Sequence, residues 1–235
     1  MKYSGRVIAI TNIIQNCSCL LDVGCDHGYV SIITCETGKA KKAIASDINV
    51  GPLQKASVNI MKAGLSDKIS TVLSDGLQSI ENSFDTVCIC GMGGLLIKDI
   101  LIKGRNKLQN VEQIVLGPHS EQYALRKYIF EETQFYIMAE TVIFEDGKYY
   151  SLWDIRKIKE KTDNIKIKDE YLMFGNPYTQ TDLSQYREML TFEISKRNKA
   201  FNDIPVAAAE KALSKKKEIG EEISVLKSLL NTTGE

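Results

Sequence analysis

Residues 20–29, which read LLDVGCDHGY, constrain the fold of this chain more than any other stretch. A short apolar run around Asp22 ends at Gly24, and Gly28 follows four residues later, just before a helix-like segment. A strand that ends in a glycine turn and feeds a helix is typical of the nucleotide-binding turn of a doubly wound α/β domain. The stretch therefore predicts a mostly parallel sheet with helices packed on both faces.

An acidic residue in this turn restricts the ligand. A dinucleotide-binding turn reads G-x-G-x-x-G, but here Asp26 occupies the position of the second glycine. Two negative charges about 4 Å apart repel by about 4 kcal/mol at an effective dielectric of about 20, which disfavours a pyrophosphate. A nucleoside ligand with positive charge and no phosphate is favoured, and S-adenosylmethionine fits through its sulfonium and ammonium groups. The residues expected to bind it here are Asp22, Gly24, Asp26, His27 and Gly28.

Strand-like and helix-like segments alternate along the first two thirds of the chain. The expected strands are residues 19–23, 42–48, 68–73, 84–90, 113–116, 135–144 and 149–155. The expected helices are residues 6–15, 29–36, 51–62, 94–102 and 123–131. Asp146 and Gly147 lie between the last two strands and indicate a hairpin. This order predicts an α/β fold, the seven-stranded sheet of a class I (Rossmann-like) methyltransferase, with one antiparallel strand at or near an edge.

The pattern changes after Arg156, so we expect a catalytic domain over residues 1–156 and a linker with a helical hairpin over 157–235. Residues 157–169 are rich in lysine and are interpreted as the linker. Two apolar stripes with helical spacing follow, separated by a turn at residues 202–205. Their residues are Leu183, Tyr186, Leu190 and Ile194, and then Ile219, Ile223, Leu226 and Leu230. We predict an antiparallel, coiled-coil-like appendage rather than a solvated tail.

Charge and cysteine content limit the possible partners. The 30 basic and 30 acidic side chains cancel, so any attraction to nucleic acid must come from a local cluster. Such a cluster lies on the predicted appendage, where it either contacts RNA or forms only a solvated helix face; its residues include Lys196, Arg197, Lys215 and Lys216. Six cysteines without a C-x-x-C pair favour buried small side chains over a metal site or disulfides. We expect a cytoplasmic chain without a metal or a membrane span.

Further candidate site residues follow the second and third predicted strands. Asp47 comes 19 residues after Gly28, close to the separation at which an acid binds a ribose hydroxyl, although it could instead cap the next helix. Asp75 could bind the adenine of the same ligand or serve only as a turn residue. The cofactor-binding set predicted here is Asp47, Ile48, Asp75, Gly76 and Gly91.

The glycine-rich stretch after the fourth predicted strand, residues 91–94, lets backbone approach a flat substrate. We expect Met92, Gly93 and Gly94 to contact the substrate, although the Met92 side chain could instead fill the core. His27 and His119 are the two histidines of the chain, and such residues are more often structural than catalytic.

Several of these motifs occur together in one order: D-x-G-x-D-H-x-Y at residues 22–29, Gly-Pro at 51–52, Asp-Gly-Leu at 75–77, Gly-Met-Gly-Gly at 91–94 and E-D-G-K-x-Y at 145–150. The chain thereby resembles the TrmK family of bacterial tRNA methyltransferases, which methylate N1 of the adenine at position 22. The motifs cover about residues 4–156, and the appendage is similar to the coiled-coil domain of that family.

The resemblance implies S-adenosylmethionine as cofactor, tRNA as partner, and Asp26, Tyr29 and His119 as catalytic residues. The family's Leu-Gln-Pro-Asn is replaced here by Leu-Gly-Pro-His at residues 116–119, so His119 could take over the role of the asparagine. A class I methyltransferase acting on a small molecule or a protein, and a catalytically idle RNA-binding module, are the alternatives. A monomer is favoured.

Overall fold

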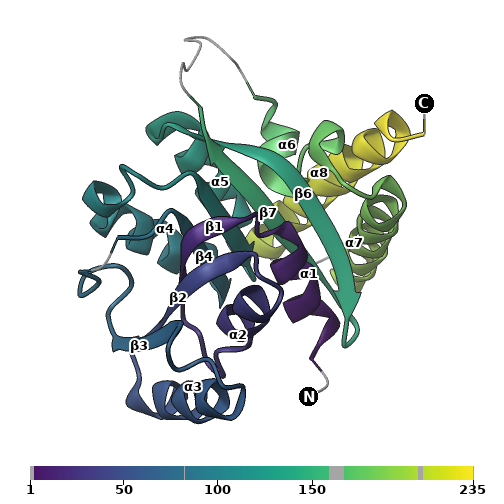
Figure 1. Ribbon diagram of the computed structural model, residues 1–235. Coiled ribbons are helices and arrows are strands. Elements are labelled where there is room, and N and C mark those ends of the chain that lie inside the picture. Colours follow the sequence, from purple (N-terminus) through teal and green to yellow (C-terminus); the bar gives the residue numbers. More distant parts are fainter. Residues whose placement is uncertain (1–2, 82, 159–166, 206–208, 235) are drawn as a thin grey trace.

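In the computed structural model, which describes residues 3–81, 83–158, 167–205 and 209–234, a seven-stranded sheet forms the centre of the molecule (Figure 1). The strands are β1 (Cys17–Val23), β2 (Ala40–Asp47), β3 (Ile69–Leu73), β4 (Thr86–Met92), β5 (Gln113–Pro118), β6 (Phe135–Glu145) and β7 (Lys148–Lys157). Their order is β3-β2-β1-β4-β5-β7-β6, and β7 runs antiparallel to both neighbours. The predicted seven-stranded α/β fold, with an antiparallel strand next to one edge, is confirmed.

Helices cover both faces of this sheet. The covering helices are α1 (Gly5–Ile13), α2 (Tyr29–Glu36), α3 (Val50–Lys62), α4 (Gly94–Lys103) and α5 (Gln122–Glu132). Three helices follow in the chain, α6 (Asp169–Phe174), α7 (Leu183–Asp203) and α8 (Glu210–Thr232). Two 3-10 turns, η1 (Arg105–Lys107) and η2 (Pro177–Thr179), complete the set. One core cluster joins the sheet to α4 and α5, and another joins it to α1, α2 and α3. Because successive strand residues such as Val87 and Cys88 belong to different clusters, β4 reads as a continuous apolar run.

Both limits of β4 differ from the predicted ones. The Asp85 carboxylate accepts hydrogen bonds from the backbone N–H groups of Ser18 (2.8 Å) and Cys19 (3.1 Å). Asp85 therefore serves as a clamp on the start of β1, and β4 begins only at Thr86 instead of the predicted residue 84. At the other end β4 extends two residues beyond the prediction, to Met92, through a register shift against β5.

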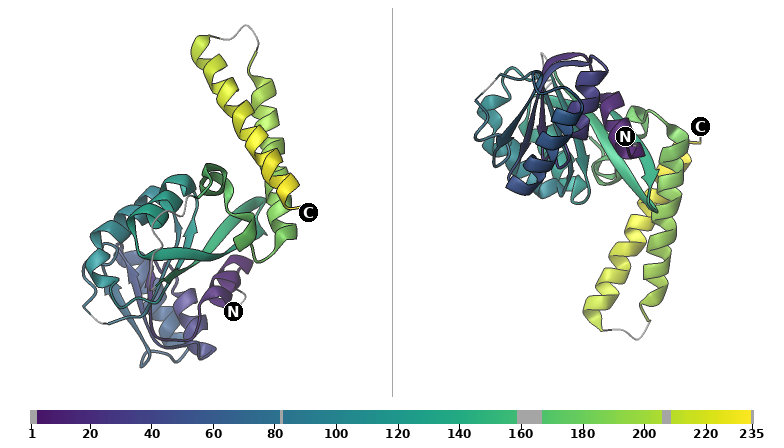
Figure 2. Two further views of the ribbon diagram at one scale, coloured as in Figure 1. Left: turned by 90° about the horizontal axis from the view of Figure 1, so that it is seen from above. Right: turned by 60° about the horizontal axis from the view of Figure 1, so that its bottom comes forward.

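The helices α7 and α8 form an antiparallel hairpin that projects from the sheet domain (Figure 2). A third core cluster lies at its base and includes Tyr186, Leu190 and Leu226, together with Val142 of β6. Two stripe residues differ from the prediction. Leu183 is 46% exposed because it lies in the first turn of α7, and Leu229 rather than Leu230 is fully buried because the seam shifts by one position in the last turn.

The base of the hairpin is tied to the sheet by buried polar groups. Arg126 of α5 and Glu140 of β6 form an ion pair of 2.7 Å in which both side chains are 2% exposed. Arg126 also donates to the carbonyl of Leu172, and Glu140 accepts from Asn176 N–H and the Thr179 hydroxyl. The linker predicted over residues 157–169 falls largely outside the described residues. The division of the chain at residue 156 stays a prediction.

Candidate functional site

The turn after β1 is held by backbone contacts to the neighbouring strand. The N–H groups of Gly24 and Cys25 both donate to the carbonyl of Ser46, at 2.8 and 2.9 Å. Gly24, Asp26 and Gly28 have φ values of 73°, 47° and 72°. A left-handed conformation is uncommon for a residue with a side chain, although aspartate tolerates it better than most, and such strain clusters at functional sites. The structure therefore retains Asp26 in a conformation that a glycine would adopt more easily.

The two glycines of this turn also permit close packing. A Cβ atom on Gly24 would lie 2.2 Å from Cε of Met92, and one on Gly28 would lie 3.1 Å from Cβ of Ala56 in α3. The Met92 side chain thus covers Gly24 and packs against the core. This packing matches the alternative in which Met92 fills the core, and contact of its partly buried side chain with a substrate stays a prediction.

Two carboxylates lie beneath the turn. Asp22 is buried and accepts a hydrogen bond of 2.9 Å from the Ser31 hydroxyl. Burial raises the pKa of Asp22 to about 6, the Ser31 hydrogen bond opposes this rise, and the nearby charge of Asp47 adds to it. Within the described residues neither carboxylate has an ion-pair partner. Negative charge without a protein cation is an environment that suits a cationic ligand.

The neighbouring strand ends carry the other cofactor candidates. Asp47 is 8% exposed, and its Oδ1 atom accepts from Asn49 N–H at 2.9 Å. Its carbonyl binds Ser74 N–H at 2.9 Å, which brings the loop of Asp75 beside it. Ile48 is 60% exposed, and Asp75 is exposed as well. These residues lie at the carboxyl ends of adjacent parallel strands, where ligands of such sheets bind.

Asp26, His27 and Tyr29 extend from the turn. The Asp26 side chain is 66% exposed, and its Oδ2 atom lies 3.5 Å from His27 Nε2. The His27 ring stacks on the Tyr29 ring with centroids 5.3 Å apart and planes within 10°. Tyr3, just before α1, contacts the Tyr29 ring edge-on, with ring centroids 5.3 Å apart. Aromatic faces beside an accessible carboxylate form a surface on which a base can stack.

The loops after β4 and β5 are joined. His119 N–H donates to the Met92 carbonyl at 2.8 Å, and Gly94 N–H donates to the Ser120 carbonyl at 2.9 Å. A Cβ on Gly94 would lie 2.6 Å from that Ser120 oxygen, so this glycine is required for the loops to approach each other. Gly91 has a φ of 84° and is exposed. The glycines of this stretch therefore shape the loop as well as leaving backbone accessible.

His119 lies where this loop pair meets a groove. Its ring contacts Tyr150 of β7 edge-on, with centroids 5.5 Å apart. Burial, followed by the charges of Arg6 and Lys148, lowers the pKa of His119 below its usual value. The imidazole is therefore neutral at pH 7, which suits hydrogen bonding to a base.

A groove of about 910 Å³ runs from His119 between the β6–β7 turn and the helical hairpin. Lys196 and Arg197 line it, whereas Lys215 and Lys216 do not. Arg197 pairs with Glu193 and, at 2.6 Å, with Glu222, so its charge is used within the hairpin. Lys196 lies 3.9 Å from Glu193 and is 69% exposed.

The two remaining lysines also have protein partners. Lys215 pairs with Glu218 at 2.8 Å, and Lys216 donates to the Ile204 carbonyl at 2.6 Å. Of the four predicted basic substrate contacts, Lys196 is thus the one with the longest ion-pair distance and a place in the groove. The structure does not bring Lys215 and Lys216 together with the other candidate residues, and their contact with a substrate stays a prediction.

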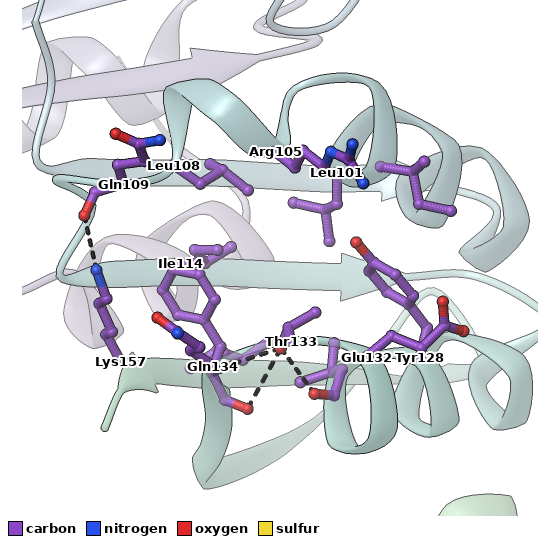
Figure 3. Close-up of a pocket in the computed structure, with 14 residues that line it drawn as sticks. Leu101, Arg105, Leu108, Gln109, Ile114, Tyr128, Glu132, Thr133, Gln134 and Lys157 are labelled. Atoms are coloured by element: carbon purple, nitrogen blue, oxygen red, sulfur yellow. Dashed lines mark hydrogen bonds between the residues drawn. The ribbon is translucent and has the colours of Figure 1, made fainter. Parts of the chain in front are cut away.

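A separate pocket of about 320 Å³ lies near the start of β5 and the end of β7, away from the strand ends that carry the candidate site (Figure 3). Ile114, Tyr128 and Leu101 provide its apolar wall, and Arg105 and Lys157 lie on its rim. None of the candidate site residues lines it.

Other features concern cofactors and membranes. Over the described residues, no group of three or more His, Cys, Asp or Glu side chains is arranged to hold a metal ion. In the same part of the chain, no helix combines the length and hydropathy needed to span a membrane.

Cys25, Cys35 and Cys88 are buried within the apolar cluster on the α1–α3 side, which confirms that they serve as small apolar side chains.

A family profile described as "TrmK: tRNA (adenine(22)-N(1))-methyltransferase" matches residues 20–228. The chain belongs to the TrmK family. The tRNA (adenine(22)-N(1))-methyltransferase of Bacillus subtilis (strain 168) is 28% identical to it over 238 residues, which cover 98% of each protein. Membership confirms the predicted family and enzyme class, a tRNA adenine-N1 methyltransferase.

Two solved structures of relatives superpose on nearly the whole of this chain. TrmK of M. capricolum, in complex with S-adenosyl-homocysteine, superposes with a TM-score of 0.82 at 30% identity, covering 98% of this chain and 99% of that one. A putative tRNA (m1A22) methyltransferase of Streptococcus pneumoniae, in complex with S-adenosyl-L-methionine, gives a TM-score of 0.80 at 30% identity, with 97% and 100% covered.

Several residues at the site escaped the sequence patterns. Tyr3 contacts Tyr29, and the Arg6 guanidinium lies 4.7 Å from the centre of the Tyr150 ring. Tyr3 and Arg6 lie at the start of α1, far from any motif, and the available signal was only the helix-capping Ser4 between them. Their place at the site is set by tertiary packing, which local patterns do not encode.

Proposed function

We propose that this TrmK chain transfers the methyl group of S-adenosylmethionine to N1 of adenine 22 in tRNA. The observation that carries the proposal is the strained turn after β1, with Asp26 at its surface and, beneath it, the carboxylates of Asp22 and Asp47, which have no ion-pair partner within the described residues. Bound S-adenosyl-homocysteine and S-adenosyl-L-methionine in the relatives from M. capricolum and Streptococcus pneumoniae support the choice of cofactor.

The residues present fit this cofactor. Asp22 and Asp47 would attract its ammonium and sulfonium charges, and Asp47 lies at the strand end where an acid binds a ribose. Ile48 and Asp75 would enclose the adenine of the cofactor, while the open space over the backbone of Gly91 leaves room for it. The cofactor supplies an activated methyl group on sulfur.

The protein's part in the reaction is chiefly positioning. Adenine N1 carries a lone pair, so attack on the methyl carbon requires no prior proton removal, and orientation can contribute about 7–11 kcal/mol. The methylated base is cationic, and the Asp26 carboxylate would stabilise the charge that develops on it. Tyr29 offers a stacking face, and neutral His119 offers a hydrogen bond to the base edge. Because N1 lies on the pairing edge, the base must leave its stack.

The hairpin of α7 and α8, with Lys196 facing the groove, is proposed to guide the tRNA toward this site. A cytoplasmic monomer is the state in which we expect the protein to act. Because basic side chains of the hairpin such as Arg197 and Lys215 are paired with glutamates, we expect it to guide the tRNA more by shape and stacking than by charge.

Transfer of tritiated methyl groups from S-adenosylmethionine to an unmodified tRNA transcript tests the proposal. We expect incorporation approaching one methyl group per tRNA. Absence of incorporation by a protein that still binds S-adenosyl-homocysteine would point to another substrate or to an idle RNA-binding module, and the proposal would be wrong.

A further inference from the structure

Arg6 differs from most arginines of the chain in its surroundings. Four of the other five arginine side chains bind carboxylates, carbonyls or hydroxyls of the protein; these are Arg126, Arg156, Arg187 and Arg197. Within the described residues the guanidiniums of Arg6 and Arg105 have no hydrogen-bond or ion-pair partner. Arg105 is exposed on the rim of the remote pocket, whereas Arg6 is half-buried at the candidate site.

Contacts on both sides place the segment of Tyr3 and Arg6 across the site. Tyr3 packs against Tyr29 in the turn after β1. Arg6 stacks on Tyr150, whose ring contacts His119, and the backbone of His119 is bonded to Met92 in the loop after β4. The guanidinium therefore lies beside the loops that we propose to receive the target base.

The fold does not need this guanidinium to anchor α1. The backbone N–H of Arg6 donates to the Glu145 carboxylate at 3.1 Å, and the Ser4 hydroxyl accepts from Val7 N–H at 3.3 Å. These bonds cap the first turn of the helix. Beyond its cation–π contact with Tyr150, the Arg6 head group keeps its hydrogen-bond donors available.

A second cation lies nearby. Lys148, the first residue of β7, is exposed, lines the groove and has no ion-pair partner within the described residues. His119 and Lys148 line the same groove, and Arg6 stacks on the Tyr150 ring that His119 contacts, so both cations lie near the His119 imidazole and lower its pKa. Two unpaired cations flanking aromatic rings form a pattern that suits a nucleotide with its phosphate.

We propose that Arg6, assisted by Lys148, binds a backbone phosphate of the tRNA next to the target adenosine. The inference rests on the proposed function and adds positioning residues to it. A planar guanidinium can hold two phosphate oxygens at once, and its stacking on Tyr150 fixes the plane in which it does so. Phosphate contacts set the register of a nucleic acid, so Arg6 would decide how far the flipped base enters the site.

Arg6→Gln, Lys148→Ala and the control Arg105→Ala test this inference. We measure tRNA affinity as a function of salt with S-adenosyl-homocysteine bound, together with KM and kcat for the transcript. Arg6→Gln should raise the KM for tRNA about tenfold and reduce the slope of log affinity against log salt by about 1. Lys148→Ala should show a smaller change in the same direction, and Arg105→Ala should match the wild type.

Arg6→Lys provides a further check, because an ammonium also binds phosphate but lacks the flat, bidentate face. It should recover the salt slope while only part of the KM is restored. A salt slope in Arg6→Gln equal to that of Arg105→Ala, in a wild-type enzyme that methylates tRNA, would overturn the inference alone. A wild type that binds the cofactor and methylates no tRNA would instead overturn the proposed function.

Discussion

The turn of residues 24–28 and the helical hairpin of α7 and α8 use charge in opposite ways. In the turn, Asp26 extends into solvent in a left-handed conformation, and Asp22 and Asp47 lie below it without a cationic partner. In the hairpin, Arg197 is held between Glu193 and Glu222, and Lys215 is paired with Glu218. Unpaired charge in a strained backbone indicates a binding site, whereas paired charge along a helix stabilises the helix itself.

This difference explains why a motif in the sequence was more informative than a run of charges. Glycines and aspartates at fixed spacing determine backbone geometry, which changes little from one member of a fold to another. A basic run gives no information on whether glutamates across the hairpin neutralise it. The clearest case is Glu222, which lies 25 residues from Arg197 in sequence and binds it across the hairpin.

The largest effect should follow removal of the accessible carboxylate in the turn. Asp26→Ala should lower kcat about 10²–10³-fold, because charge developing on the adenine loses its stabilising partner. Calorimetric affinity for S-adenosyl-homocysteine and the unfolding midpoint show whether the site remains intact. Full turnover in this variant would remove Asp26 from the mechanism.

Gly24→Ala should come next. The alanine must adopt a φ near 73°, and its Cβ would lie 2.2 Å from Cε of Met92. We therefore expect a loss of about 1–3 kcal/mol in the free energy of unfolding. Urea denaturation measures this loss. In a Met92→Ala background, Gly24→Ala should cost less because the steric part is relieved, while an equal cost in both backgrounds would show that backbone strain alone is responsible.

A pH dependence of cofactor binding should follow from Asp22. Burial raises its pKa to about 6, and a bound cation favours the carboxylate and lowers that pKa again. Between pH 5 and pH 7 the site therefore loses a proton, and affinity for S-adenosylmethionine should rise about tenfold. Calorimetry measures the affinity at each pH. In the control variant Asp22→Asn the affinity should not change with pH, and an equal rise in that variant would assign the dependence to another group.

The smallest effect is expected from the hairpin lysines. Lys215→Ala and Lys216→Ala lose local contacts within the hairpin, and the exposed Lys215–Glu218 pair is screened by solvent and contributes little. Their KM for tRNA should stay within about twofold of the wild type by the same measure. A tenfold rise in either variant would show that these side chains leave their glutamate or carbonyl partners to bind tRNA, and the contrast between turn and hairpin would then weaken.

Much of the fold could be predicted because local patterns and sheet topology agree here. The turn of residues 24–28 and the Asp-Gly hairpin each fix local geometry, and α2 has the predicted limits. Features that depend on contacts between distant segments could not be predicted. Examples are the clamp of Asp85 on β1, the Arg126–Glu140 ion pair under the hairpin, and the place of Arg6 beside Tyr150.

The central claim is that the protein methylates one defined adenine of tRNA and that Asp26, in the turn after β1, is needed for this reaction. Primer extension on a tRNA transcript after reaction with the wild-type enzyme tests it most directly, because a methyl group on N1 blocks base pairing and stops the polymerase. With the reaction stopped when the wild type has just completed methylation, we predict a single arrest at adenine 22 that is lost with Asp26→Ala and with a transcript carrying guanine at that position. An arrest elsewhere, or one that persists in the Asp26→Ala variant, would contradict the account.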